Sequence, residues 1–425
     1  MKYTKKDLGS FNLHMIETNK FKTITIRVVF HTPIEKKEIT KRNILSDILL
    51  QSSKKYDSKR NLTIAAEELY AADIATNNQR LGNYIITNFN LQILCDKYTE
   101  EGNLEKSIEF LSEIIFNPDV EDKKFQTTKF DIVKNNMEVA LNSIKEDATT
   151  YSLIRMSEAY DKNSPTSLRM IGYKEDLEEI TPINLYECYE KMIENDYVDI
   201  FVVGEFDNKE MLSLIKKYFK FKKIKKPKKS YFTEPKKPRK RRLFARETIN
   251  NTQSKLAIAC PINNLTDYER NYSLTLANII LGGGTESKLF KEVREKYSLC
   301  YTIHSFAKKL DHVLIITAGI DKNNFNKTVD LITKNLLDMK KGKITDREIE
   351  IAKEFYHTSL EEIEESENRM ISEIMSQEIL GLSSIQERMT KMKKVRKQDI
   401  IKVCKKINMD TVFLLEGVKH EENDI

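Results

Sequence analysis

Metal binding is the first chemistry to test in this 425-residue sequence, because imidazole side chains are common zinc ligands. A zinc-binding helix needs two neutral imidazoles about one turn apart, and no two of the six histidines have that spacing. Only His304 and His312 share strand-like surroundings, and we expect no metal role for them. The histidines are His14, His31, His304, His312, His357 and His420.

Other catalytic motifs are also missing from the sequence. It contains no GxSxG nucleophile elbow, no phosphate-binding P-loop and no dinucleotide fingerprint. The five cysteines are scattered, odd in number and without a CxxC pair, so we interpret them as reduced and mostly buried thiols. The cysteines therefore indicate neither a redox site nor a zinc site.

A glycine triplet is the most distinctive short motif. Gly282, Gly283 and Gly284 follow the apolar stretch Tyr272–Leu281, which predicts a helix. The simplest interpretation of the triplet is a helix C-cap and a loop. The alternative is a hinge, or a place where a substrate approaches the backbone.

The composition is that of a globular protein with a heavily charged surface, at 40% hydrophobic and 32% charged residues. The N-terminal residues contain no apolar run suited to a signal peptide or a membrane anchor, so we expect a cytoplasmic protein without a membrane partner. Residues 222–242 hold twelve Lys or Arg against one Glu, which exceeds the net charge of +6 of the whole chain. The positive charge is local, and a nucleic-acid-binding face is not indicated.

The basic run at 222–242 predicts the domain organisation. It contains three of the eight prolines and no core-forming periodicity, so it predicts an extended, self-repelling linker. The alternative is a docking strip for an acidic partner or substrate. The linker separates an N-terminal domain at 1–221 from a C-terminal domain at 243–425.

The two flanking segments repeat each other in their predicted elements. In each, a helix precedes two strands, two amphipathic helices follow, and a further helix and strand close the half. In the first half these elements are Thr63–Ala72, Ile74–Asn78, Tyr84–Leu94, Leu104–Phe116, a helix within Asp122–Ile144, Ile183–Ile193 and Asp199–Gly204. In the second half they are Leu289–Lys296, Cys300–Ala307, His312–Ile320, Phe325–Met339, a helix from Thr345-Asp346, Lys397–Ile407 and Asp410–Gly417.

Strands at both ends of each repeat with helices between them predict the α+β class. We expect two homologous half-domains, each a mostly antiparallel sheet with helices packed on one face.

The segment from Leu281 to Tyr301 reads LGGGTESKLFKEVREKYSLCY. It resembles the LGGGxxSRLFxxLREkxGLaY signature of the pitrilysin-like (insulinase-type) peptidase family, which includes mitochondrial processing peptidase. The glycine triplet, Leu289-Phe290, Arg294 and Tyr301 are in register with that signature. The resemblance implies duplicated α+β halves joined by a linker and arranged as a clamshell.

The family's zinc motif, HxxEH, should then occupy a helix in the first half. The predicted helix is Ile39–Leu50, and the resemblance places Asn43, Ser46 and Asp47 at the His, Glu and His positions. These residues supply neither two imidazoles nor a general base. The third ligand position falls at Ala140 or Leu141, with Glu138 nearby. We therefore expect no metal or other cofactor in this chain.

The resemblance assigns a role to Arg294 and Tyr301. In family members of the bacterial two-subunit type, one subunit supplies HxxEH, and an Arg and a Tyr of the other contact the substrate. A guanidinium and a phenol can donate hydrogen bonds to the oxyanion of a peptide under attack. The resemblance thus implies a zinc-bearing homologous partner and an extended peptide substrate, bound by strand addition. The structural alternative is an exposed helix charge and a packed aromatic.

Two other functions stay open. One is an inactive scaffold or assembly protein, because respiratory-chain core proteins share the fold without the reaction. Some zinc-less bacterial members are associated by name with modification of elongation factor P, and others with maturation of peptide antibiotics. The other is an autonomous peptidase with a divergent site, which would need ligands that the sequence lacks.

Overall fold

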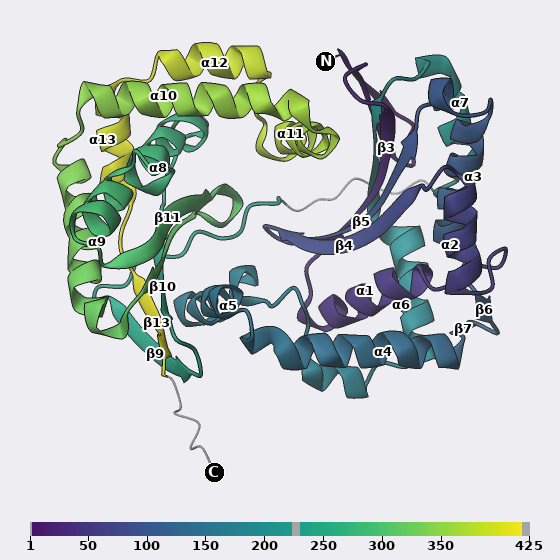
Figure 1. Ribbon diagram of the computed structural model, residues 1–425, viewed down its shortest axis with the longest axis horizontal. Coiled ribbons are helices and arrows are strands. Elements are labelled where there is room, and N and C mark those ends of the chain that lie inside the picture. Colours follow the sequence, from purple (N-terminus) through teal and green to yellow (C-terminus); the bar gives the residue numbers. More distant parts are fainter. Residues whose placement is uncertain (1, 223–229, 419–425) are drawn as a thin grey trace. The chain divides into compact units, whose positions relative to one another are not determined.

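The computed structural model describes residues 2–222 and 230–418, so residues 223–229 of the predicted linker lie outside the described part (Figure 1). The chain forms two compact units, and neither is continuous in sequence. Unit 1 comprises Met1–Asn142, Arg169–Tyr231 and Ile363–Met375. Unit 2 comprises Ser143–Leu168, Phe232–Glu362 and Ser376–Ile425.

Unit 1 contains a six-stranded sheet in the order β1-β2-β8-β3-β5-β4. All neighbouring strands are antiparallel except β2 and β8. Alternate residues of β3 enter different cores, with Val28 on one face and Val29 on the other, as the two-residue period of a strand requires. The strands are β1 (Lys2–Asp7), β2 (Asn12–Glu17), β3 (Thr23–Pro33), β4 (Asp73–Leu81), β5 (Tyr84–Leu94) and β8 (Tyr197–Gly204).

Helices of the first half cover one face of this sheet and build its main core. They are α1 (Lys36–Leu49), α2 (Lys59–Glu68), α3 (Asn103–Phe116), α4 (Thr127–Asn142), α6 (Pro182–Asn195) and α7 (Asn208–Tyr218). A short ribbon of β6 (Val120–Glu121) and β7 (Lys124–Phe125) precedes α4.

Unit 2 repeats this plan with a five-stranded sheet in the order β11-β12-β10-β13-β9. Its neighbouring strands are antiparallel except β13 and β9. The strands are β9 (Leu243–Ile249), β10 (Ser254–Pro261), β11 (Cys300–Lys308), β12 (Val313–Ile320) and β13 (Thr411–Gly417). The helices are α8 (Leu274–Gly282), α9 (Phe325–Lys340), α10 (Asp346–Glu361), α12 (Ile385–Lys393) and α13 (Lys397–Lys406), with π-helical segments η5 (Glu269–Ser273) and η6 (Phe290–Lys296).

The predicted α+β class and the repeat of the two halves are confirmed. The predicted strand Tyr84–Leu94 matches β5 at both ends, and the predicted start of α10 carries a capping box between Thr345 and Glu348. The helix at Leu289–Lys296 is present but π-helical over Phe290–Lys296.

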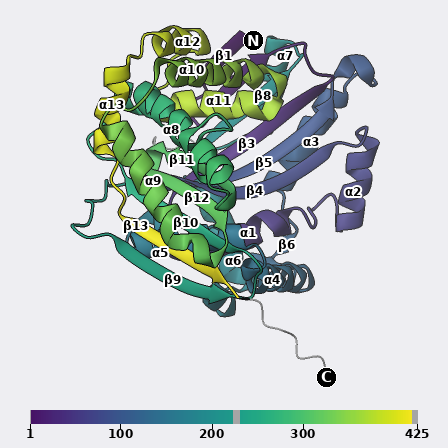
Figure 2. The same ribbon diagram turned by 60° about the vertical axis from the view of Figure 1, so that its left-hand side comes forward.

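The expectation of helices on one face of each sheet needs a correction. The second face of each sheet is also buried, under a helix that lies on the other side of the linker in sequence. Helix α5 (Ala148–Tyr160) packs on β10 and β13 of unit 2 (Figure 2). Residues 367–375 of α11 (Glu367–Leu380) pack on the sheet of unit 1. The strands are apolar on both faces, so a sheet with one bare face would expose hydrophobic surface.

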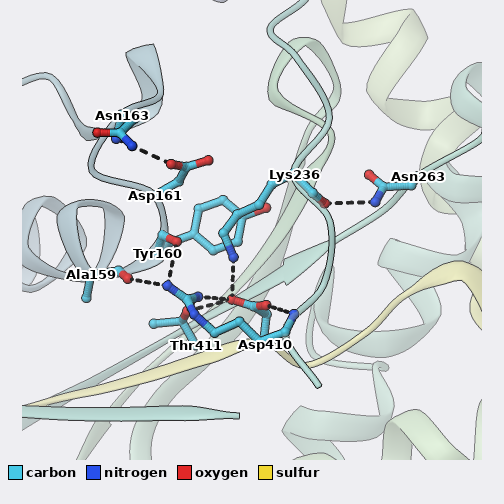
Figure 3. A network of polar contacts seen from close by, with 9 residues as sticks. Ala159, Tyr160, Asp161, Asn163, Lys236, Asn263, Asp410 and Thr411 are labelled. Carbon is cyan, nitrogen blue, oxygen red and sulfur yellow. Dashed lines mark hydrogen bonds and ion pairs between the residues drawn. The ribbon is translucent and has the colours of Figure 1, made fainter. Parts of the chain in front are cut away.

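The described end of the linker is anchored and is not a solvated tether. In unit 1, the Tyr231 hydroxyl lies 2.8 Å from Nδ1 of the buried His31. In unit 2, the Lys236 ammonium approaches the buried carboxylate of Asp410 at 2.9 Å, as Figure 3 shows. The backbone N–H of Arg239 donates to the same carboxylate at 2.6 Å, and its guanidinium donates to the carbonyl oxygens of Ala159 and Tyr160 at 3.0 Å. Two of the linker's cations therefore neutralise a buried acid.

Candidate functional site

The three positions that align with the zinc motif lie on α1. Two of them are hydrogen-bonded, and the third is exposed. Asn43 Nδ2 donates to the Met170 carbonyl oxygen at 2.8 Å. Ser46 Oγ donates to the Asn43 carbonyl oxygen at 3.0 Å and accepts from Asn78 Nδ2 at 2.8 Å. The Asp47 side chain lies on the exposed side of α1. Partial desolvation by its neighbours raises the pKa of its carboxyl. At the positions where the family has metal ligands, this chain therefore has an amide and a hydroxyl that form hydrogen bonds with other groups of the protein.

The residues near the third ligand position also lack a free carboxylate. Leu141 packs against the core of unit 1, and Glu138 forms an ion pair with Lys174 at 3.2 Å. Over residues 2–222 and 230–418, no three His, Cys, Asp or Glu side chains gather as a metal site requires. The donor set on α1 and α4 therefore does not fit zinc.

Arg294 and Tyr301 come together in unit 2. The Arg294 guanidinium carbon lies 4.6 Å from the centre of the Phe290 ring and 5.8 Å from that of Tyr301. Contacts of this kind between a cation and an aromatic face are attractive and orient the guanidinium. Val293, the neighbour of Arg294, is fully buried and fixes η6 against the core.

Tyr301 stands at a bulge in an edge strand. Cys300 pairs with Ile320 and Thr302 pairs with Gly319, so Tyr301 is the extra residue on β11. A bulge redirects side chains at a sheet edge. Tyr301 is 75% exposed, and its hydroxyl has no partner among the described residues. Both predicted donors are thus available at the start of an edge strand.

A turn closed by a hydrogen bond between residues six positions apart sets the position of this pair. The Leu299 N–H donates to the Val293 carbonyl oxygen at 3.0 Å, and the Ser298 N–H donates to the Arg294 carbonyl oxygen at 3.0 Å. Ser298 has a φ of 49°, which the closure of such a turn requires.

A turn with the same two hydrogen bonds joins α2 to β4 in unit 1. There the Ala72 N–H donates to the Ala66 carbonyl oxygen at 2.9 Å, and the Ala71 N–H donates to the Glu67 carbonyl oxygen at 3.1 Å. Ala71 has a φ of 56°. By this correspondence Glu67 matches Arg294, and Ile74 matches Tyr301.

The glycine triplet packs closely against its neighbours. A Cβ on Gly282 would lie 2.7 Å from Ser305 Oγ of β11, and one on Gly283 would lie 2.6 Å from Ile279 Cα. Gly284 has ordinary space, with Phe355 at 3.5 Å. Helix α8 ends at Gly282, as the interpretation of the triplet as a helix C-cap and loop requires. A role as a hinge or as a place of substrate approach stays a prediction.

Two features of the Arg294 cluster were not predicted. Phe290 lies one turn before Arg294, and the four-residue spacing could have indicated the contact. Cys300 is half-buried beside them; burial raises the pKa of its thiol to about 11, and the Arg294 charge opposes that shift. The thiol therefore stays protonated at neutral pH.

The two histidines with strand-like surroundings do not share a site. His304 Nε2 lies 2.9 Å from Thr317 Oγ1. His312 lies in the turn before β12 with a φ of 50°, beside Phe232. In the part of the chain that the structure describes, no helix is long and apolar enough to span a membrane.

Comparison with known proteins supports the family resemblance. Residues 179–356 match the model of the Peptidase M16 inactive domain. A Bacillus subtilis (strain 168) protein named "Probable inactive metalloprotease YmfF" is 29% identical over 419 residues, 97% of each chain. A conserved protein from Enterococcus faecalis V583 is 29% identical with a TM-score of 0.89, over 99% of this chain and 100% of that chain.

A peptidase M16 inactive domain from Pseudomonas fluorescens superposes with a TM-score of 0.79 at 15% identity, over 99% of each chain, and supports the fold. The resemblance seen in the Leu281–Tyr301 segment is confirmed. The chain is therefore similar to M16 (pitrilysin-like) peptidases over almost its whole length, and two of these relatives carry names that mark them as inactive.

Proposed function

We propose that this chain is the non-zinc subunit of a heterodimeric M16 peptidase. It contributes Arg294 and Tyr301 to a substrate that a homologous HxxEH subunit hydrolyses. The observation that carries the proposal is the pairing of an exposed guanidinium and an exposed phenol at the start of edge strand β11. The α1 positions in the same chain hold no metal-binding set.

Edge strand β11 supports an extended peptide as the substrate. Its backbone pairs with β12 on one side only, because β11 is the first strand in the order of its sheet. Free backbone N–H and C=O groups at a sheet edge can add a further strand. Main-chain hydrogen bonds would provide affinity with little dependence on sequence.

The chemistry of the two side chains suits a peptide bond under attack. Arg294 carries a permanent positive charge, and Tyr301 offers a neutral O–H donor. Donors that are already oriented stabilise a developing oxyanion without reorganisation. The stacking of Arg294 on Phe290 supplies that orientation. Activation of water would come from the partner, since this chain has no general base at Ser46.

Reconstitution tests the proposal. The chain is mixed with an HxxEH-bearing homologue encoded in the same genome, and cleavage of a quenched fluorescent peptide is measured. We expect activity only in the mixture. Arg294→Ala should lower kcat/KM by about 100-fold and Tyr301→Phe by about 10-fold, as for loss of an oxyanion donor.

Glu67→Ala is the matched control, because Glu67 holds the same place in the turn of unit 1. It should leave cleavage unchanged. Association is followed by analytical ultracentrifugation, so that loss of the complex is not mistaken for loss of catalysis. If the mixture cleaves equally well with Arg294→Ala and Tyr301→Phe, the substrate-contact role is wrong. A complex that forms without cleaving would favour the scaffold function instead.

A further inference from the structure

A groove lies between helices α10 and α12 of unit 2, which run side by side (Figure 1, Figure 2). It has a volume of about 350 Å³, which is at the small end of ligand-binding pockets. It shares no lining residue with the Leu281–Tyr301 segment, so it is a separate feature of the same unit. The residues that line this α10–α12 groove include Glu350, Glu354, His357, Met389, Met392 and Lys393.

Helix α10 presents polar and charged side chains to the groove. Glu350, Glu354 and His357 are spaced by four and three residues, so they lie on one face of the helix. Glu350 forms an ion pair with Lys353 at 3.1 Å, and His357 Nδ1 lies 3.4 Å from a carboxylate oxygen of Glu361. The Glu354 carboxylate has no hydrogen-bond or ion-pair partner among the described residues. It is therefore available to a ligand.

Helix α12 contributes an apolar floor and a cation. Met392 is 2% exposed and belongs to the core of unit 2, and Met389 is half-buried one turn before it. Thioether side chains are flexible and polarizable, so they adapt to apolar and aromatic groups. Lys393 is exposed, and its ammonium has no partner in the part of the chain that the structure describes. The groove thus has an anion on one helix, a cation on the other and thioethers at its base.

Glu354 and Lys393 line the same groove but do not form an ion pair with each other. Opposite charges commonly pair when their side chains can reach each other, as Lys391 and Glu387 of α12 do at 2.5 Å. The groove keeps the two charges apart. A ligand that spans it would pair with both.

Two solvated surface charges are the simplest alternative explanation. Glu354 and Lys393 are both exposed, and an exposed charge needs no partner in the protein. That explanation accounts for the charges, but it gives no role to the thioether floor of the groove. An apolar base flanked by an anion and a cation is complementary to a ligand with an ammonium, a carboxylate and an apolar group.

We propose that the α10–α12 groove binds a short zwitterionic peptide, of two or three residues, with apolar side chains. The Glu354 carboxylate accepts hydrogen bonds from the terminal ammonium, and the Lys393 ammonium donates to the terminal carboxylate. An apolar side chain of the peptide packs on Met389 and Met392. Hydrogen bonds between ionised groups are roughly twice as strong as those between neutral groups, so both termini contribute to affinity.

This site goes beyond the proposed function, because Arg294 and Tyr301 do not line the groove. Under the proposed function, short peptides are products of the partner's reaction. The binding itself does not depend on that function.

Titration calorimetry of the full chain with four small probes tests the proposal. Leucyl-leucine has both charges and apolar side chains, its N-acetyl form lacks the ammonium, and its C-terminal amide lacks the carboxylate. Each blocked form should bind at least about 10-fold more weakly than leucyl-leucine. Glycylglycine keeps both charges and should also bind more weakly, because it lacks the apolar groups.

Substitutions assign each end of the peptide to one helix. Glu354→Gln should remove the difference between leucyl-leucine and its N-acetyl form, and Lys393→Met should remove the difference between leucyl-leucine and its amide. Lys394→Met is the matched control, because Lys394 is an exposed neighbour that does not line the groove. It should leave both differences unchanged. Thermal denaturation checks that each variant is folded.

Oxidation of methionine provides a second readout that locates the peptide. Leucyl-leucine should slow the conversion of Met389 to its sulfoxide by hydrogen peroxide, because the bound peptide covers the thioether. Met409 is the control, since it is half-buried in the same unit and does not line the groove. Mass spectrometry of the digested protein measures both. Equal protection of the two methionines, or of neither, would contradict the site.

The outcomes separate this site from the proposed function. If leucyl-leucine does not bind at millimolar concentration, or binds no better than its blocked forms, the groove site is wrong. Loss of cleavage in Arg294→Ala and Tyr301→Phe would then still support the proposed function. If leucyl-leucine binds through Glu354 and Lys393 while Arg294→Ala and Tyr301→Phe leave cleavage unchanged, the groove site stands and the substrate-contact role fails.

Discussion

The turn from α2 to β4 and the turn from η6 to β11 share two closing hydrogen bonds but carry different side chains. In each turn a hydrogen bond joins two residues six positions apart, and the next-to-last residue of the turn has a positive φ: Ala71 in one and Ser298 in the other. Tyr70 of the first turn also has a positive φ. The first presents Glu67 and Ile74, and the second presents Arg294 and Tyr301. The two halves therefore close these turns with the same hydrogen bonds, while only the second turn presents a guanidinium and a phenol.

The same contrast holds for the helices that carry the aligned positions. Helix α1 has polar residues that hydrogen-bond within unit 1, whereas η6 exposes its guanidinium to solvent. Two of the three aligned positions of unit 1 are thus hydrogen-bonded within the unit, whereas Arg294 and Tyr301 of unit 2 are exposed.

The largest effect should come from the ion pair that anchors α1. Arg42 binds Asp196 through two hydrogen bonds of 2.6 Å and 3.0 Å, and both side chains are buried. Arg42→Met leaves a buried carboxylate unpaired, so the free energy of unfolding should fall by about 3–5 kcal/mol. Urea denaturation measures the loss. Lys41→Met, at the half-buried neighbour, is the control and should change stability little.

The next effect concerns the buried acid of unit 1 and depends on pH. Burial alone would raise the pKa of Asp199, but hydrogen bonds and charge from His14 and His31 outweigh it and hold the pKa well below its usual value. A depressed folded-state pKa stabilises the fold above about pH 4, and this contribution is lost as the pH falls further.

Asp199→Asn should therefore lower the free energy of unfolding by about 2–3 kcal/mol at pH 7 and by less at pH 3. Urea denaturation at both values measures the difference. A loss of equal size at pH 3 and pH 7 would show that the ionised carboxylate is not the source of the stability.

The smallest effect separates two glycines of one triplet. Gly282→Ala places a methyl group against Ser305 of β11 and should lower the free energy of unfolding by about 1–3 kcal/mol. Gly284→Ala meets only Phe355 at an ordinary distance and should be nearly neutral. Thermal denaturation compares the two variants. Equal melting temperatures would contradict the close packing of α8 on β11.

The sequence was most informative where local signals agree. The alternation of apolar residues located β5, and the capping pair at Thr345 located α10. The signature placed Arg294 and Tyr301 in one segment, and the structure adds the stacking and the bulge that bring them together.

The packing of α5 and α11 could not be predicted from local sequence, because each helix packs on a sheet from the other side of the linker. Helix α11 buries Met370, Ile371 and Ile374, a helical spacing that is visible in the sequence. The sheet on which it packs is far away in the chain, and periodicity does not specify a packing partner. The prediction of a self-repelling linker was wrong for the same reason. Lys236 and Arg239 bind the carboxylate of Asp410, which is far away in the sequence.

Photocrosslinking tests whether Tyr301 contacts the peptide. A benzoylphenylalanine is placed at Tyr301 or, as the matched control, at Ile74, and each variant is irradiated with the HxxEH homologue and an extended peptide. We expect the peptide to be crosslinked at position 301 and not at position 74. Crosslinking at position 74 alone, or at neither position in a complex that cleaves the peptide, would contradict this contact.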